Sequence, residues 1–268
     1  MAHARVPAGS LAPQDNTRPE LHSEALAEAK IDLAACFRMA ARLGFEEGIC
    51  NHFSAVVPGC DDLFIVNPYG LAFHEVTASS LLVCDLDGSV VTGDGEPEAT
   101  AFHIHAEIHR RVPHARVAFH THMPYATALT MVEGDPLVFA GQTALKFYGR
   151  VAVDEDYGGL ALDGAEGARI ASAIGEADIV FMRQHGVMVL ARTIAEAWDD
   201  LYYLERACEV QCIAMSLGRP LIPVAEEVAR KTAAQMRKGD AASAKLHLES
   251  VKRLLDAEEP GYRGGRRP

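Results

Sequence analysis

One stretch, Val117-Ala118-Phe119-His120-Thr121-His122-Met123-Pro124, joins a short apolar run to two alternating histidines. A β-strand sends alternate side chains to opposite faces, so His120 and His122 share a face with their Cα atoms about 7 Å apart. Two imidazoles at this spacing can close on a single divalent metal ion. The alternative is a hydrogen-bonded polar histidine at the end of a strand, which explains a lone histidine better than a pair. We therefore predict a metal site at this strand end.

A metal site needs a third protein ligand from elsewhere in the chain, and His185 is the best candidate. It follows the apolar run 179–182 within Arg183-Gln184-His185-Gly186, where the glycine lets the backbone turn sharply. The alternative for His185 is a polar turn residue without a ligand. Its place at the end of one strand, beside the His-x-His at the end of another, favours a metal ligand.

The helix predicted before the His-x-His strand carries a second histidine pair, His105 and His109, on one helical face. In the zinc-protease pattern H-E-x-x-H, the glutamate directly follows the first histidine. Glu107 lies two residues after His105, which is about 200° around the helix. A zinc protease is therefore not expected, and His105 is predicted to contact the strand that carries His120.

Composition and charge are those of an ordinary globular chain. The 268 residues are 49% hydrophobic and 23% charged, which fits one large domain or two small ones. The 25 basic and 37 acidic residues give a net charge of −12, which argues against nucleic acid or an anionic membrane as a partner. No apolar run reaches about 18 residues, so no membrane-spanning helix is expected. Six cysteines without a C-x-x-C pair predict a reduced, cytoplasmic protein.

Hydrophobic periodicity and turn residues predict an alternation of helices and short strands along the chain. The expected elements are a helix at 22–43, a hairpin at 48–57 and 63–66, a hairpin at 83–91, a helix at 99–112, the strand before His120, a short helix at 124–130, a loop-rich region at 131–160, a helix at 163–174, strands at 179–182 and 187–190, a helix from 193 to about 215, and one or two helices within 225–257.

Hairpins dominate over crossovers in this order. The predicted fold class is therefore α/β, a three-layer α/β/α sandwich with a mixed, mostly antiparallel central sheet. No G-x-G-x-x-G follows a strand, and no phosphate-loop motif supports a nucleotide cofactor. We predict a single domain at 21–258, a flexible N-terminal arm at 1–20 and a flexible C-terminal tail at 259–268.

Several short motifs between about Glu24 and Arg219 resemble those of the class II aldolase/adducin family in their order and spacing. The resembling pieces are Gly48-Ile49-Cys50-Asn51-His52-Phe53-Ser54, Asn67-Pro68-Tyr69-Gly70, Thr77-Ala78-Ser79-Ser80-Leu81, His105 with Ile108-His109 and Pro113, Val117 through His122, Gln184-His185-Gly186, and Tyr202-Tyr203-Leu204-Glu205. The resemblance implies a mixed-sheet α/β/α domain that binds a small-molecule substrate. It also implies a homo-oligomer, usually a tetramer, with active sites between subunits.

The resemblance further implies a divalent metal held by His120, His122 and His185. Zinc is the expected metal, with manganese or iron as alternatives. In the sugar-phosphate aldolases and epimerases of this family, the metal binds the carbonyl and hydroxyl oxygens of the substrate and stabilises an enediolate.

Four further residues match positions that handle the substrate in this family. Asn51 and the turn Tyr69-Gly70 match positions that hold its phosphate or other anionic end. A tyrosine from a neighbouring subunit often donates a proton, and Tyr148 is the candidate for this role.

The sequence departs from the aldolases at their catalytic glutamate. Counting back from Pro113 places Ala101 at that position, and Ala99 and Thr100 replace two of the usual phosphate-binding serines. These changes argue against a phosphorylated sugar as substrate. Glu98 is the candidate replacement for the glutamate, although a carboxylate at the start of a helix also favours the helix dipole.

Three functions follow from the resemblance. The first is a metal-dependent carbon–carbon lyase of aldolase type, acting on a small hydroxy-carbonyl substrate. The second is a metal-dependent decarboxylase of a hydroxy-aromatic or hydroxy acid. The third is a non-catalytic interaction module like the adducin head. The three converging histidines favour an enzyme, because an inert scaffold has no physical reason to assemble them.

Overall fold

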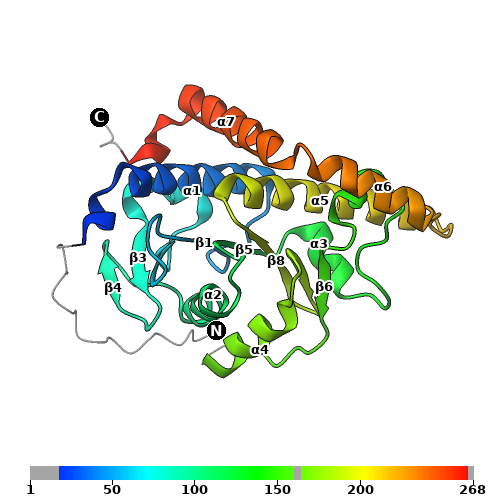
Figure 1. Cartoon of the computed structure of the whole chain (residues 1–268), viewed down its shortest axis with the longest axis horizontal. Helices are drawn as coiled ribbons and strands as arrows, with labels where there is room; N and C mark the ends of the chain where they lie inside the picture. The colour runs from blue at the N-terminus through cyan, green and yellow to red at the C-terminus, as the bar shows by residue number, and fades with distance from the viewer. Residues whose placement is uncertain (1–17, 160–163, 265–268) are drawn as a thin grey trace.

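A computed structural model describes residues 18–159 and 164–264, which form one eight-stranded sheet between two layers of helices (Figure 1). The strands are β1 (His52–Val56), β2 (Leu63–Val66), β3 (Leu82–Asp85), β4 (Val90–Thr92), β5 (Val117–Thr121), β6 (Val151–Asp154), β7 (Ile179–Met182) and β8 (Gly186–Ala191). The α-helices are α1 (Glu24–Leu43), α2 (Ala99–Arg111), α3 (Pro124–Thr130), α4 (Gly164–Ile174), α5 (Ile194–Ser216), α6 (Glu226–Arg237) and α7 (Asp240–Glu258).

The strand order is β4-β3-β2-β1-β5-β8-β7-β6, which places β5 near the middle of the sheet. All neighbouring strands pair antiparallel except β6 and β7, which pair parallel. The mixed, mostly antiparallel sheet and the α/β class are therefore confirmed. The strand β6 was not predicted, because it lies in the region 131–160 that was expected to be loop-rich. With four residues at the sheet edge, three of them half-buried and one buried, the strand is too short to show a clear period.

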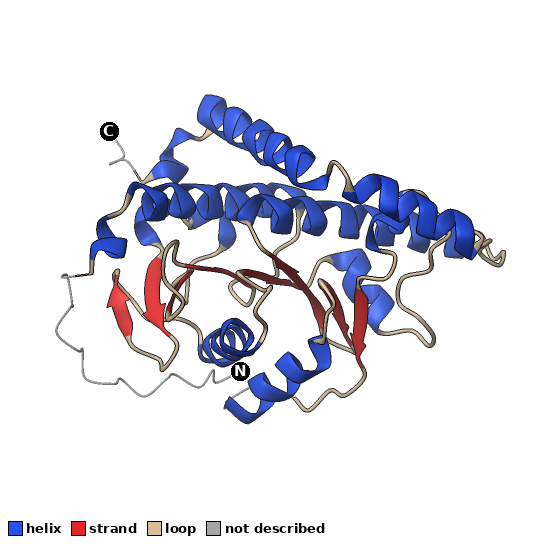
Figure 2. Ribbon diagram, in the orientation of Figure 1, coloured by secondary structure: helices blue, strands red, loops and turns tan. Residues whose placement is uncertain are grey.

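The alternating side chains of β5 separate the two faces of the sheet. Val117 and Phe119 enter the large core beneath α1 and α5, where the Phe119 ring stacks on Phe53 with centroids 4.0 Å apart. Ala118 faces the smaller core beneath α2 and α4, and His120 lies on that same face. Figure 2 shows these helix layers on opposite sides of the sheet, and α6 and α7 lie outside the layer that α1 and α5 form. The histidines therefore project toward the α2 and α4 side.

Short-range chemistry determines where the long helices begin and end. Ser23 caps α1 by accepting a hydrogen bond from the Leu26 amide at 3.1 Å, and the helix ends at Gly44 with φ +71°. Thr193 caps α5 in the same way, as the Thr-x-x-Glu pattern predicts. Among residues 18–159 and 164–264, no helix is both long and apolar enough to cross a membrane.

The chain ends differ from the sequence prediction. Residues 1–17 of the expected N-terminal arm lie outside the described residues, whereas Pro19–His22 forms a 3-10 helix, η1. The tail was expected to be flexible from residue 259, but Pro260–Arg263 forms the 3-10 helix η5. Tyr262 is fully buried within η5, and its hydroxyl donates to Asp256 at 3.0 Å. A single aromatic anchor within a polar sequence gave no periodic signal, so the tail prediction was wrong for these residues.

We expect Tyr262→Ala to lower the free energy of unfolding by about 3 kcal/mol, because the variant empties a buried aromatic site. Urea unfolding followed by circular dichroism measures this change. Leu246→Ala on α7 is the control, since the Leu246 side chain is largely exposed and its loss should cost no more than about 0.5 kcal/mol. Equal stability of the two variants would show that η5 does not anchor the C-terminus.

Candidate metal centre

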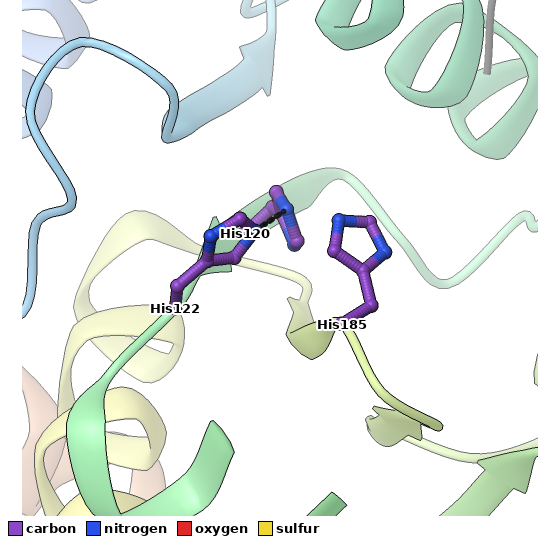
Figure 3. A group of neighbouring side chains, drawn as sticks. All are labelled: His120, His122 and His185. Atoms are coloured by element: carbon purple, nitrogen blue, oxygen red, sulfur yellow. Dashed lines mark hydrogen bonds between the residues drawn. The ribbon is translucent and has the colours of Figure 1, made fainter. Parts of the chain in front are cut away.

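Three histidines meet at one end of β5. His120 is on the strand, His122 directly follows it, and His185 lies in the turn between β7 and β8. One ring nitrogen from each lies within 4.8 Å of the others, and the two Nε2 atoms of His120 and His122 are 3.2 Å apart. Figure 3 shows the three side chains gathered around this point. The structure thus brings together residues that are 65 positions apart in sequence, because β5 and β8 are neighbours in the sheet.

Hydrogen bonds on the far side of the His120 and His122 rings leave the inward nitrogens of these two rings available. His120 donates from Nδ1 to the Val187 carbonyl at 3.0 Å, and the Nδ1 of His122 hydrogen-bonds to the Glu47 carboxylate. With Nδ1 as the donor, the Nε2 of each ring keeps its lone pair. Metal-binding histidines characteristically have such outer partners, which orient the ring.

Burial keeps two of these rings in the neutral form that binds metals. Desolvation lowers the pKa of His120 well below its ordinary value. Desolvation, together with the nearby His122 ring, lowers the pKa of His185 to about 4. Neutral imidazoles bind a metal without first losing a proton at neutral pH. The donor set therefore fits a borderline divalent metal such as zinc.

The backbone around the histidines is closely packed. Gln184 adopts φ +57°, and the His185 amide donates to the Met182 carbonyl at 3.1 Å, which closes the tight turn. A Cβ atom on Gly186 would lie 2.6 Å from the Thr121 carbonyl oxygen and 2.7 Å from Cδ2 of His122. Glycine is therefore required where β8 passes the end of β5 that carries His120 and His122.

The proposed substrate-binding residues occupy three different environments. Asn51 is buried outside the cavity lining, and its Oδ1 accepts from the Glu47 amide at 2.8 Å and the His122 amide at 3.4 Å. Tyr69 lines the cavity beside the histidines, while Gly70 follows it with φ +92° in the turn. Asn51 thus braces the backbone beside the three histidines, and Tyr69 forms part of the cavity wall.

Of the two proposed catalytic residues, Glu98 lines the cavity and Tyr148 does not. Glu98 lines the cavity and caps α2, since its carboxylate accepts from the Ala101 amide at 2.8 Å and from the Thr100 hydroxyl. Tyr148 lies outside the cavity lining of its own chain, and its ring packs against Phe139 with centroids 5.0 Å apart. Its role as a proton donor remains a prediction that concerns a neighbouring subunit.

The cavity beside the histidines has a volume of about 380 Å³. Sequence reasoning missed several of its side chains, including Glu47, His52, Asp154, Tyr157, Glu166 and Arg169. These come from separate segments that only the fold brings together. His52 carried a detectable signal, because His52 and Ser54 alternate on a strand as His120 and His122 do.

The charged groups of the cavity wall are mainly acidic. Its carboxylates belong to Glu47, Glu98, Asp154, Asp156 and Glu166, and its two guanidinium groups to Arg169 and Arg183. Arg169 already pairs with Asp154 and Glu166, at distances of 2.6 to 2.9 Å. Arg183 donates to Glu155 and to two backbone carbonyls. Among the described residues, the wall offers no uncommitted cation for a phosphate.

The histidines of α2 make different contacts from those predicted. His105 hydrogen-bonds to His52 and Ser54 of β1, the neighbour of β5, instead of to the strand of His120. Burial lowers the pKa of His105 well below its usual range and that of His109 to about 4. Burial and the neighbouring His122 and His185 lower the pKa of His52 to about 3. All three rings are therefore neutral at neutral pH.

The fold and the site together define a class of protein. Residues 31–212 match the family model of the Class II Aldolase and Adducin N-terminal domain. The chain belongs to this family, which confirms the resemblance drawn from its motifs.

The sequence is also similar to individual proteins. The chain is 35% identical to a putative aldolase class 2 protein of Caulobacter vibrioides, over 90% of this chain and 93% of that protein. It is 31% identical to decarboxylase NovR of Streptomyces niveus, over 81% of this chain and 80% of that protein.

Solved structures share the same fold. An aldolase II superfamily protein from Pseudomonas syringae is 32% identical with a TM-score of 0.84, covering 90% of this chain and 97% of that one. An L-fuculose 1-phosphate aldolase from Glaciozyma antarctica is 27% identical with a TM-score of 0.77, covering 89% and 93%. The likeness thus extends to named aldolases and to a decarboxylase.

Proposed function

We propose that this chain is a divalent-metal-dependent lyase that cleaves a carbon–carbon bond in a small, unphosphorylated hydroxy-carbonyl compound. One observation carries the proposal: three imidazoles converge at the wall of a cavity large enough for such a molecule. The likeness to an L-fuculose 1-phosphate aldolase supports aldol cleavage as the reaction.

His120, His122 and His185 would hold the metal, and zinc fits their nitrogen donors best. When bound, such a metal supplies Lewis acidity that polarises a carbonyl or hydroxyl oxygen of the substrate. Val187 and Glu47 would keep the His120 and His122 rings oriented through their Nδ1 atoms. Tyr69, at the cavity wall, would contact the substrate.

The charge of the cavity supports an unphosphorylated substrate. A phosphate dianion needs uncommitted cationic or N–H donors, but the guanidinium groups of Arg169 and Arg183 are already paired. The remaining wall carboxylates repel an anion. A neutral polyhydroxylated carbonyl compound fits this lining better than a sugar phosphate does.

Glu98 is the proposed proton-transfer residue, because it is a carboxylate of the cavity wall close to the position of Ala101. We expect Glu98→Gln to lower turnover by about 100-fold or more while metal content stays unchanged, since a general base typically contributes that much. The glutamine keeps an oxygen to cap α2. Glu96→Gln, in the preceding exposed loop, is the matched control. Equal loss in both variants would remove Glu98 from the reaction.

Metal analysis of purified protein tests the proposed site directly. We expect about one zinc per chain after zinc-supplemented expression, and loss of that metal in His120→Ala, because two nitrogen ligands seldom hold zinc. His74→Ala, which removes a largely exposed histidine, should keep full occupancy. Less than about 0.1 metal per wild-type chain would reject the enzyme and favour an adducin-like interaction module.

Decarboxylation is the second candidate function, favoured by the 31% identity to decarboxylase NovR. A panel of unphosphorylated sugars, sugar phosphates, 2-keto-3-deoxy acids and aromatic hydroxy acids, scored separately for aldehyde and CO₂, distinguishes the two reactions. Aldehyde without CO₂ supports the lyase proposal. CO₂ from a hydroxy acid supports the alternative.

We further propose a cytoplasmic homotetramer whose active sites lie between subunits, with Tyr148 reaching a neighbouring cavity. Exposed apolar side chains on one end of α5, among them Val210, Ile213 and Met215, support burial against another subunit. Light scattering of the purified protein measures the assembly. A monomer would exclude a catalytic role for Tyr148.

A further inference from the structure

A continuous line of hydrogen bonds leads from the loop after α2 to the wall of the cavity. The Nδ1 of His109 lies 2.8 Å from the Ala115 carbonyl oxygen, and its Nε2 lies 2.7 Å from the Ser54 hydroxyl. That hydroxyl lies 2.5 Å from Nδ1 of His105. The Nε2 of His105 lies 3.2 Å from Nδ1 of His52. We call these four side chains, His109, Ser54, His105 and His52, the histidine chain.

The Ala115 carbonyl group at one end of the histidine chain determines the direction of every hydrogen bond in it. A carbonyl oxygen only accepts, so the proton of neutral His109 is on Nδ1 and its Nε2 is an acceptor. Ser54 must then donate to His109 and accept from Nδ1 of His105. A neutral His105 has its lone pair on Nε2, which accepts from Nδ1 of His52. No other assignment satisfies all four contacts with neutral rings.

At the other end of the histidine chain lies the Nε2 atom of His52. This ring is buried and lines the cavity, where it stacks on His120 with centroids 5.1 Å apart. The two residues are cross-strand partners of β1 and β5, so their side chains share a face of the sheet. The nearest oxygen of Glu98 is 3.9 Å from Nε2, beyond hydrogen-bond distance. His52 is not part of the group of three converging histidines.

We propose that the histidine chain holds His52 in the Nδ1–H tautomer, so that its Nε2 atom accepts a hydrogen bond from a hydroxyl group of the substrate beside the metal site. His52 is then a substrate-binding residue, and Ser54, His105 and His109 are positioning residues. The acceptor selects a hydroxyl over a keto group at the adjacent substrate carbon, because a keto oxygen has no proton to donate. This inference rests on the proposed function in one respect only, namely that a substrate binds beside the metal site.

Nuclear magnetic resonance of metal-free protein with ¹⁵N-labelled histidine tests the tautomer, since two-bond ¹H–¹⁵N correlations distinguish a protonated from an unprotonated ring nitrogen. We expect the Nδ1–H form for His52, His105 and His109 at neutral pH. Ser54→Ala should disturb the signals of His105 and His52. Cys84→Ala is the matched control, because it also removes one buried heavy atom beneath α2 and should leave them unchanged. An Nε2–H form of His52 in the wild type would overturn the proposal.

Binding of a neutral diol and its keto analogue to zinc-loaded protein tests the ligand. We expect calorimetry to show tighter binding of propane-1,2-diol than of hydroxyacetone, and His52→Phe to reduce that preference about 2- to 10-fold, the range of one neutral hydrogen bond. An unchanged preference in His52→Phe would overturn the ligand role. Failure to load zinc would reject the metal site alone, since the tautomer measurement needs no metal.

Discussion

Gly186→Ala is expected to weaken zinc binding by roughly 10- to 100-fold, the loss typical of displaced outer-shell support, and to lower the free energy of unfolding by about 1–3 kcal/mol through overpacking. The new Cβ atom would lie 2.6 Å from the Thr121 carbonyl oxygen and 2.7 Å from Cδ2 of His122. Neither contact can be relieved by a flexible side chain end, because one partner is backbone and the other is a ring held by Glu47. The strand β8 must therefore move away from β5, or the His122 ring must leave its place.

Zinc titration with a competing chelator and urea unfolding of the metal-free protein measure these two effects separately. Gly141→Ala is the control, since a Cβ atom there meets nothing within 4 Å and its φ is not positive. It should bind zinc normally and change stability by no more than about 0.5 kcal/mol. Wild-type affinity in Gly186→Ala would mean that the approach of β8 does not govern the position of His122.

The stability of the protein is expected to fall steeply as the pH drops from about 6 to about 4.5, partly because of His105 and His109. Burial lowers the pKa of His109 from 6.5 to about 4 and that of His105 well below 6.5. Between the unfolded and folded pKa values, the unfolded chain binds a proton that the folded chain does not. The free energy of unfolding therefore decreases with falling pH, by about 1.4 kcal/mol per pH unit for each such histidine.

His109→Gln isolates one of these contributions. The slope of the free energy of unfolding against pH should become shallower by about 1.4 kcal/mol per pH unit across this window. Urea unfolding at half-unit steps of pH measures the slope. Cys84→Ala should lower stability at every pH and leave the slope unchanged, because it removes a buried atom without a titrating histidine. An unaltered slope in His109→Gln would show that His109 is protonated in the folded state near pH 5.

Local sequence was sufficient for much of the architecture. Ser23, Gly44 and Thr193 act through backbone groups within a few residues, so the ends of α1 and α5 follow from local chemistry. The alternation in β5 likewise placed His120 on the face opposite Phe119, which the two separate cores confirm. The edge strand β6 and the buried Tyr262 escaped prediction, because β6 depends on its pairing with β7 and Tyr262 on its place in the large core, and neither shows as a repeating pattern.

The sequence by itself determined the family and the His-x-His pair, since both reside in short, ordered motifs. Only the tertiary structure decided what surrounds that pair. The pairing of β1 with β5 places His52 beside His120, and the packing of α2 on β1 extends the contact to His105. The sequence argued against a sugar phosphate only through Ala99 and Thr100, and the pairing of Arg169 with Asp154 and Glu166 adds the electrostatic reason for the neutral substrate that we propose. Such contacts join residues far apart in the chain, so the physical cause lies in packing and charge that no local pattern encodes.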